Sequence, residues 1–392
     1  MPADRPRVAF LTDIITPYMA AVMEALAERV ELTALFCSRS GTRAASWAFE
    51  DGLPFRHRVL GGWAIRRTAD STDFYPSPRI LRAVAYERPH AVISGGFSFP
   101  SAYAAAYGGL RGAGLVIHSD GTSYSERNLG RAQLAARALL VRAAGAYVGN
   151  SEPAAQRFIE LGAPPERVFR ALHTTNMAPY WEVHRRRMRS SAADTGSLRL
   201  VTVGRLIPRK GVDRLLRAVA VARAAEPGIR LAVVGSGPEE AALRALTAEL
   251  GLVETVEFRG FVDQPGLPAV YEAADAFAFP TLDDPFGIVL LEAAASGLPL
   301  VASPFGGATL DLVEEGRTGY VVDPGDTHAL ARALLSLARD PAVRLAMGAA
   351  AHASTRTRTP AAAADGYARA VACAMTRSRP GGCTPEMPPD DA

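Results

Sequence analysis

Short, continuously apolar runs alternate with longer alanine-rich stretches throughout the chain. In its first half the apolar runs predict strands over Arg7–Thr12, Glu31–Phe36, Arg56–Leu60, Ala91–Ser94, Gly114–His118 and Ala146–Gly149. The stretches between them predict helices, for example over Pro17–Arg29, Phe99–Arg111 and Arg131–Ala144. Because the strands are apolar at successive rather than alternate positions, both faces of their sheet should be covered. This alternation is typical of parallel-sheet α/β units.

The alternation of short apolar runs and alanine-rich stretches stops between residues 177 and 198. There Pro179 and Trp181 precede the basic cluster Arg185-Arg186-Arg187 and the small polar run Ser190–Ser197. Such a composition is more typical of a solvated linker than of a segment that binds acidic partners. We therefore expect an N-terminal domain over 1–176, a linker over 177–198 and a second domain over 199–359.

The alternation then resumes and predicts a second doubly wound domain. Its strands are expected over Leu198–Val203, Ile229–Val234, Thr255–Phe258, Ala276–Pro280 and Pro299–Ser303. Its helices are expected over Val212–Ala225, Glu239–Leu250, Pro268–Ala273, Gly287–Ser296 and from Thr309 onward. A last helix over Pro360–Met375 carries an apolar stripe that must be buried. The Pro/Gly-rich tail over 377–392 is expected to be disordered.

Length and composition agree with two domains and argue against several classes of protein. The chain has 392 residues, and single hydrophobic cores stop growing near ~250–300 residues. A net charge of +3 is too small to imply nucleic-acid binding. Three widely spaced cysteines exclude a disulfide framework and fit a reducing compartment. Neither a signal-peptide core nor an apolar window of membrane-spanning length, ~18 residues, is found. We expect a cytoplasmic protein.

The only lysine of the chain, Lys210, lies in a loop that could bind an anion. The loop Gly204–Gly211 starts where a strand is predicted to end and finishes where a helix begins, and open α/β sheets bind ligands at that edge. Gly204 lets the backbone approach a ligand, while Arg205 and Lys210 can converge two positive charges on it. The loop matches neither a P-loop nor a dinucleotide fingerprint, so an ordinary strand–loop–helix turn is as compatible with it.

A second candidate anion site lies at the start of an apolar helix. The N–H groups of Phe286, Gly287 and Ile288, together with the helix dipole, form a ready anion site. Asp284 precedes these groups. Glu292 lies more than a turn into the helix among apolar neighbours, so its carboxylate needs hydrogen-bond partners, and ligand hydroxyls are a natural kind.

The run Asp284–Ala293 resembles the E-x7-E signature of the retaining GT-B glycosyltransferases of family four. The Gly-Arg-Leu…Lys-Gly loop resembles that family's donor-diphosphate motif. Further matches follow in order at Gly235–Pro238, Phe258–Val262, Ala274-Asp275, Ser296–Pro299 and Gly306-Gly307. There are two departures, since Asp284 replaces the family's first Glu and the segment Thr12–Tyr18 replaces the usual Gly-Gly loop. The resemblance implies two Rossmann-like domains facing a cleft, with a helix over 360–376 that crosses back onto the first domain.

The resemblance also implies roles for individual residues. Arg205 and Lys210 would clamp the diphosphate of a nucleoside-diphosphate sugar, next to Gly204, and stabilise the leaving group. Asp284 and the backbone of Phe286, Gly287 and Ile288 would hold the sugar and β-phosphate, and Glu292 would accept hydrogen bonds from the ribose. The base would be framed by two further loops, represented by Gly235, Gly237, Gly260, Phe261 and Val262. Asp283-Asp284 is not a DxD metal motif, so neither a metal nor another cofactor is expected.

The sequence indicates the residues that would bind the acceptor less clearly than those that would bind the donor. His118 ends a predicted strand, where it is as compatible with a catalytic role toward a sugar or acceptor hydroxyl as with a structural one. Asp13 and Asp120 are further candidates for accepting the acceptor proton. The aromatic side chains of Tyr18 and Phe97 could contact the acceptor, although packing is the more usual role of such residues.

These observations favour a retaining hexosyltransferase that uses a nucleoside-diphosphate sugar and a small-molecule, cyclitol or glycolipid acceptor. The alternatives are a sugar-nucleotide epimerase of related architecture and a non-catalytic sugar-nucleotide-binding protein. Arg66, Arg67 and Arg127 could meet anionic lipid head groups, so a peripheral contact with the inner face of the membrane is a second expected location. The donor base and sugar, the acceptor and the oligomeric state stay open.

Overall fold

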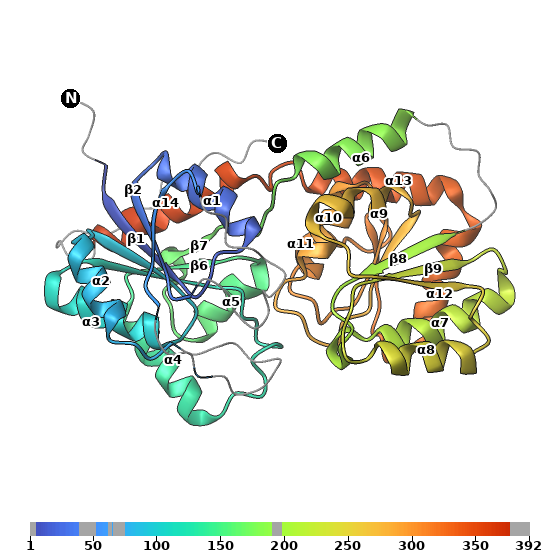
Figure 1. Cartoon of the computed structure of the whole chain (residues 1–392), viewed down its shortest axis with the longest axis horizontal. Helices are drawn as coiled ribbons and strands as arrows, with labels where there is room; N and C mark the ends of the chain where they lie inside the picture. Colours follow the sequence, from blue (N-terminus) through green and yellow to red (C-terminus); the bar gives the residue numbers. More distant parts are fainter. Residues whose placement is uncertain (1–4, 39–51, 62–64, 66–74, 190–197, 377–392) are drawn as a thin grey trace. The chain divides into compact units, whose positions relative to one another are not determined.

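The computed structural model describes residues 5–38, 52–61, 65, 75–189 and 198–376. They form two compact units, Met1–Thr175 with Arg358–Ala392 and Asn176–Thr357. Each unit contains a parallel sheet with helices on both faces (Figure 1). The predicted class, an α/β protein with two Rossmann-like domains, is therefore confirmed. Arg66, Arg67 and the tail over 377–392 lie outside the described residues.

The first unit is built on a seven-stranded sheet in the order β3-β2-β1-β4-β5-β6-β7. Its strands are β1 (Arg7–Thr12), β2 (Glu31–Phe36), β3 (Arg56–Val59), β4 (Ala91–Gly95), β5 (Gly114–Ser119), β6 (Ala146–Gly149) and β7 (Val168–Arg170). All neighbouring pairs are parallel. The carboxyl ends of β1, β4, β5 and β6 therefore meet at one edge of the sheet, where ligands bind in open α/β folds.

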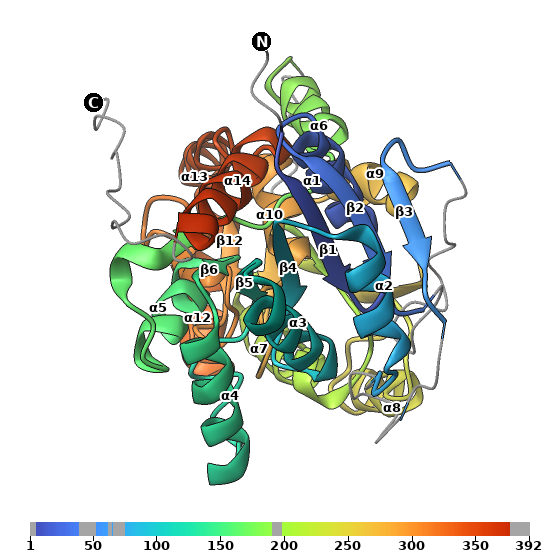
Figure 2. The same cartoon turned by 90° about the vertical axis from the view of Figure 1, so that its left-hand side faces the viewer.

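Helices cover both faces of this sheet (Figure 2). They are α1 (Pro17–Ala27), α2 (Arg79–Glu87), α3 (Phe99–Arg111), α4 (Arg131–Ala143), α5 (Glu152–Glu160) and α14 (Pro360–Thr376). Buried side chains of α1 and α14 share a core with one face of the sheet, whereas those of α2, α3, α4 and α5 share a core with the other. The continuously apolar strands have the two covered faces that their sequence predicts.

The last helix, α14, belongs to the first unit although it follows the whole of the second in sequence. Its stripe Ala364, Tyr367 and Val371 is buried. The helix contacts β4, β5, β6 and β7, and the ring of Tyr367 also meets that of Phe10 in β1 at 5.5 Å. The approach is close because small residues face each other: a methyl group on Gly145 would lie 2.9 Å from the α-carbon of Ala374. Burial of this apolar stripe satisfies the requirement set by its helical spacing.

The second unit is built on a six-stranded parallel sheet in the order β10-β9-β8-β11-β12-β13. Its strands are β8 (Arg199–Val203), β9 (Arg230–Val234), β10 (Val256–Gly260), β11 (Ala276–Phe279), β12 (Leu300–Ala302) and β13 (Gly319–Val321). Its helices are α6 (Ala178–Arg189), α7 (Val212–Ala225), α8 (Glu240–Glu249), α9 (Leu267–Glu272), α10 (Ile288–Ala295), α11 (Thr309–Leu312), α12 (Thr327–Arg339) and α13 (Pro341–Ser354). One core contains α7, α8 and α12, and a second contains α6, α9, α10 and α13.

The predicted linker over 177–198 is wrong for its described part. Residues Ala178–Arg189 form α6, whose Tyr180 and Val183 are buried in the core of the second unit. The basic cluster has structural partners: Arg186 forms a two-pronged ion pair with Glu272 at 2.7 and 2.8 Å, and Arg187 donates to carbonyls at the end of α9. Cations at a helix C-terminus satisfy carbonyls that the helix leaves unpaired. Residues 190–197 lie outside the described residues.

Candidate active site

The loops after β8 and β9 pack backbone against backbone at the carboxyl edge of the second sheet. The Gly204 N–H donates to the Val234 carbonyl at 2.9 Å, and the Leu206 N–H donates to the Ser236 carbonyl at 2.9 Å. Gly235 has a φ of +133°, and a methyl group there would lie 1.8 Å from the Gly204 carbonyl oxygen. Only glycine combines this φ with this approach. Gly235 thus fixes the shape of the loop that carries Arg205.

The two predicted phosphate-binding cations lie at the same place. Arg205 and Lys210 line one small hollow at the end of β8, together with Gly204 and Phe279. Lys210 belongs to a short 3₁₀ turn, Pro208–Lys210, and the chain enters α7 through Gly211. A methyl group on Gly211 would lie 2.1 Å from the Pro280 carbonyl oxygen, so this turn needs a glycine. The two residues on which the sequence predicts converging positive charge therefore line the same hollow.

Asp284 lies directly beside this pair of cations. Its Oδ2 forms an ion pair with Lys210 Nζ, and its Oδ1 accepts from the Phe286 N–H at 3.2 Å. The side chains of Lys210 and Asp284 are only 17% and 14% exposed, which strengthens the attraction relative to a pair in water. The lysine that was expected to meet phosphate and the acid that was expected to meet sugar thus contact each other.

The segment that carries Asp284 is held by the loop after β12. Asp284 and Gly306 form an isolated parallel bridge, and the Gly307 N–H donates to the Asp284 carbonyl at 2.9 Å. Gly287, at the start of α10, has a φ of +90°, and a methyl group there would lie 2.4 Å from the ring of Phe279. The first turn of α10, which begins at Ile288, therefore follows Asp284 closely along the chain. The first N–H groups of a helix have no partner within the helix, so they are available to an anion.

Glu292 differs from its expected surroundings. Its side chain is 2% exposed, and its two oxygens accept from the hydroxyls of Tyr180 and Tyr271 at 2.9 Å each. Burial raises the pKa of Glu292 to about 7, and the two tyrosine hydrogen bonds partly oppose that increase. We expected ligand hydroxyls to satisfy this carboxylate. That expectation is corrected, because two tyrosines, one from α6 and one from α9, already donate hydrogen bonds to it.

The remaining predicted donor residues lie on the loops after β9 and β10. A methyl group on Gly237 would lie 2.3 Å from the Leu206 carbonyl oxygen, so Gly237 keeps these loops close together. Gly260 has a φ of +71°, and its carbonyl accepts from the Gly235 N–H at 2.7 Å. Phe261 is 58% exposed, whereas Val262 packs against the core. An exposed aromatic ring beside a glycine-built loop suits a stacked base.

In the first unit, the ring of His118 is partly buried at the end of β5. Its Nδ1 lies 3.3 Å from the Tyr367 hydroxyl of α14, and its ring meets the ring of Phe10 edge to face at 5.2 Å. Burial, and secondarily His173, lowers the pKa of His118 to about 3. His118 is therefore neutral near pH 7, and its Nε2 has no hydrogen-bond partner among the described residues.

The other acceptor candidates lie around the same edge of the first sheet with different surroundings. Tyr18 of α1 packs edge to face on the ring of His173 at 5.2 Å. Phe97 packs on Phe158 and lies under the Arg137 guanidinium, 4.7 Å from the ring centroid, so packing is its observed role. Asp13, which follows β1, is partly buried, and Asp120, which follows β5, is exposed.

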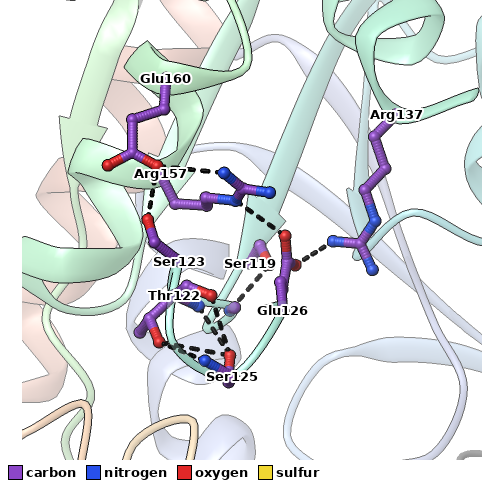
Figure 3. Close-up of polar contacts among 9 residues, drawn as sticks. Ser119, Thr122, Ser123, Ser125, Glu126, Arg137, Arg157 and Glu160 are labelled. Atoms are coloured by element: carbon purple, nitrogen blue, oxygen red, sulfur yellow. Dashed lines mark hydrogen bonds and ion pairs between the residues drawn. The ribbon is translucent and has the colours of Figure 1, made fainter. Parts of the chain in front are cut away.

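Glu126 organises the loop after β5, although no motif in the sequence marks it (Figure 3). Its carboxylate is 8% exposed and forms ion pairs with Arg137 of α4 and Arg157 of α5, the latter at 2.9 Å. Arg157 also contacts Glu160 at 3.0 Å. A methyl group on Gly121 would lie 2.3 Å from Glu126 Oε1, so the loop folds tightly over this acid. The network fixes the loop that follows β5 and carries Asp120.

No group of three or more His, Cys, Asp or Glu side chains is arranged to hold a metal ion in the described part of the chain. Among the described helices, none has both the length and the apolar character needed to cross a bilayer.

Two family models match the chain. The model described as glycosyl transferases group 1 matches residues 184–354, and the one described as a glycosyl transferase 4-like domain matches residues 15–170. The first of these contains every predicted donor residue, and the second contains His118. Together the two matches span most of the chain.

Curated relatives match part of the chain. The GDP-mannose-dependent alpha-(1-6)-phosphatidylinositol monomannoside mannosyltransferase of Mycolicibacterium smegmatis is 42% identical over 158 residues, which is 38% of this chain and 41% of that protein. The D-inositol 3-phosphate glycosyltransferase of Pseudarthrobacter chlorophenolicus is 34% identical over 238 residues, 58% of this chain and 56% of that protein. The matched segments thus span less than two thirds of either relative.

A solved structure with the same fold covers nearly the whole chain. HepE of Anabaena, solved in complex with UDP and glucose, superposes with a TM-score of 0.72 at 20% identity and covers 94% of this chain and 99% of its own. At that identity the likeness concerns the fold, and it extends through both units.

Proposed function

Because the chain belongs to the GT-B glycosyltransferases of family four, we propose that it moves a hexosyl unit from a nucleoside-diphosphate sugar to an acceptor hydroxyl. The observation that carries this proposal is the hollow at the edge of the second sheet that Arg205 and Lys210 line together. Lys210 also pairs with Asp284, which lies four residues before the first residue of α10. Two cations and a helix N-terminus stabilise the charge that develops on a departing diphosphate.

The donor diphosphate would displace Asp284 from Lys210. In the free protein the two side chains satisfy each other, so the charge of Lys210 is already compensated. A bound diphosphate supplies a stronger negative partner for Lys210, and the sugar hydroxyls then supply hydrogen bonds for the released carboxylate. In this proposal Asp284 acts as the switchable partner that holds Lys210 in position between turnovers.

We propose that the transfer retains the anomeric configuration, by attack on the face that the diphosphate leaves. Retention without a covalent intermediate requires that the leaving phosphate itself assists the incoming hydroxyl, which the clamp on that phosphate allows. Neutral His118 could accept a hydrogen bond from a sugar or acceptor hydroxyl, and no step is assigned to a metal. We further propose an acceptor of the inositol-phosphate or phosphoinositide type, on the names of the two relatives.

The proposal is tested by incubating the purified full chain with UDP- and GDP-linked hexoses, with and without myo-inositol, inositol phosphates or phosphatidylinositol. Mass spectrometry of the products should show one added hexose, and NMR should show the anomeric configuration of the donor. Epimerised nucleotide sugar without transfer would support the epimerase alternative. Donor binding with neither transfer nor hydrolysis for any pair would support the non-catalytic alternative.

A further inference from the structure

Four polar side chains form a continuous row across the carboxyl edge of the first sheet. His118 ends β5, Asn150 follows β6, His173 follows β7, and Tyr367 reaches them from α14. The Tyr367 hydroxyl lies 3.3 Å from His118 Nδ1 and 3.5 Å from Asn150 Oδ1, and Asn150 Nδ2 lies 3.1 Å from His173 Nε2. These contacts lie within one unit and connect the candidate catalytic histidine to the last helix.

The row has one consistent direction of donation. The Asn150 amide donates from Nδ2 to the ring of His173, which leaves Oδ1 as the acceptor on the other side. Tyr367 has a single hydroxyl proton, and it donates this proton to Asn150 Oδ1. The Tyr367 oxygen can then only accept, so the His118 Nδ1 must carry the proton of the neutral ring. His118 Nε2 is left with a lone pair.

The space beside His118 Nε2 is provided by a glycine. A methyl group on Gly95, at the end of β4, would lie 3.0 Å from His118 Nε2 and 3.6 Å from Thr12 Oγ1. The Nε2 atom itself is buried and has no hydrogen-bond partner among the described residues. A buried acceptor without a donor is destabilising, so a ligand that supplies a donor at this place removes that penalty.

We propose that Tyr367, oriented by Asn150, is a positioning residue that holds His118 in the Nδ1-protonated tautomer, so that Nε2 accepts a hydrogen bond from a substrate hydroxyl beside Gly95. Tyr367 does not touch the substrate. The identity of the hydroxyl as one of a sugar or of its acceptor rests on the proposed function, whereas the tautomer and its cause do not.

The tautomer is measured by NMR on the full chain with ¹⁵N-labelled histidine, because a protonated and an unprotonated ring nitrogen differ strongly in chemical shift. The His118 signals are identified by their loss in His118→Gln. In the parent protein near neutral pH, His118 Nε2 should be unprotonated and Nδ1 protonated. In Tyr367→Phe, which keeps the buried ring, the population should shift to the Nε2-protonated form.

Controls make this result specific. Tyr107→Phe alters a tyrosine buried in the core on the opposite face of the sheet and should leave the His118 signals unchanged. Asn150→Ser removes the acceptor that orients the Tyr367 hydroxyl and should shift the tautomer in the same direction as Tyr367→Phe. An Nε2-protonated His118 in the parent protein overturns the proposal, and so does an unchanged tautomer in a folded Tyr367→Phe protein.

A kinetic arm separates this proposal from the proposed function. Tyr367→Phe and Gly95→Ala should each lower the kcat/KM of transfer by about 5- to 10-fold, the worth of one hydrogen bond, and leave nucleoside-diphosphate affinity unchanged. A protein with the expected tautomer but without transfer of any sugar contradicts the proposed function alone. Active transfer from a protein whose His118 is Nε2-protonated contradicts the positioning role alone.

Discussion

Lys210 Nζ and Asp284 Oδ2 form an ion pair at the carboxyl edge of the second sheet, across 74 residues of sequence. Lys210 is the only lysine of the chain, and Asp284 stands where the family signature has Glu. The pair explains how a shorter acid can be accommodated, because Asp284 is placed to meet the lysine and the Phe286 N–H at the same time. Lys210 and Asp284 thus compensate each other's charge before a donor binds.

Removal of Asp284 should separate sugar transfer from nucleotide binding. Asp284→Ala deprives the sugar of its carboxylate contact and should lower turnover on the order of 10²-fold, since positioning errors near ~1 Å have effects of that size. It also frees Lys210, so the affinity for the nucleoside diphosphate should stay the same or increase. Steady-state kinetics and calorimetry measure the two effects, with Asp213→Ala, an exposed acid at the start of α7, as the control.

Asp284→Glu should not improve the enzyme although it restores the residue of the family signature. The extra methylene moves the carboxylate by roughly 1.5 Å, one carbon–carbon step, past the position where it meets Lys210 and Phe286. A turnover of Asp284→Ala within about threefold of the parent would show that this acid has lost its contact with the donor.

The apolar strands and the loops that follow them could be predicted from sequence because their signals are local. Strand ends such as Thr12 and Val203 agree with the continuous apolar runs, and Gly204, Lys210 and Gly287 lie in motifs of fixed spacing. The signals that failed depend on contacts between distant residues. Helix α6 looks polar because only Tyr180 and Val183 of its residues are buried, and Tyr180 meets Glu292 112 residues later.

The Glu126 network was missed for the same reason. Nothing near Glu126 in sequence indicates that Arg157, 31 residues away, will bury it. The three-residue strands β7 and β13 are too short to give a periodic signal. Local patterns thus predict which loops lie at the carboxyl edge of the second sheet, whereas the partners of buried charges depend on the tertiary fold.

The buried Glu292 should make unfolding pH-dependent. Its folded pKa of about 7 lies above the ordinary value, so the folded state holds the proton more tightly than the unfolded chain. The resulting stabilisation is present at low pH and is lost as the pH rises through about 7. In denaturant unfolding experiments, the contribution of this group to the free energy of unfolding should fall by about 3 kcal/mol between about pH 5 and pH 8.

Glu292→Gln removes the titration and should flatten that part of the pH profile. Thr247→Val, which alters another buried polar side chain of the same unit, should keep it. Parallel pH profiles for Glu292→Gln and the parent would mean that Glu292 stays charged in the folded protein, with the two tyrosines compensating its burial in full.

The last helix should stabilise the first unit. Truncation before Ala361 removes Tyr367 and Val371 from the core, and fully burying a side chain of that size contributes about 1.5–3 kcal/mol. Differential scanning calorimetry should show a large decrease in the melting temperature of the first unit. A chain that ends at Thr376 keeps α14 and should melt like the parent. Equal melting of the two truncated chains would contradict the packing described for α14.

Transfer should not require a divalent metal. In the proposed complex Arg205, Lys210 and the N-terminus of α10 supply positive charge to the diphosphate, so no metal ion is needed to neutralise it. The initial rate should therefore be unchanged in excess EDTA. If the rate vanishes with EDTA and returns with Mg²⁺ or Mn²⁺, a metal ion, and not this cluster, neutralises the charge of the diphosphate.

The most direct test of the donor site is the rate of nucleoside-diphosphate release from the cognate donor by the parent, Lys210→Ala and Arg217→Ala. Lys210→Ala should lower the rate on the order of 10²-fold or more, as expected for loss of a group that stabilises the leaving diphosphate. Arg217→Ala removes an exposed charge from α7 and should release nucleoside diphosphate like the parent. Near-parent release by Lys210→Ala would contradict the assignment of this sheet edge as the donor site.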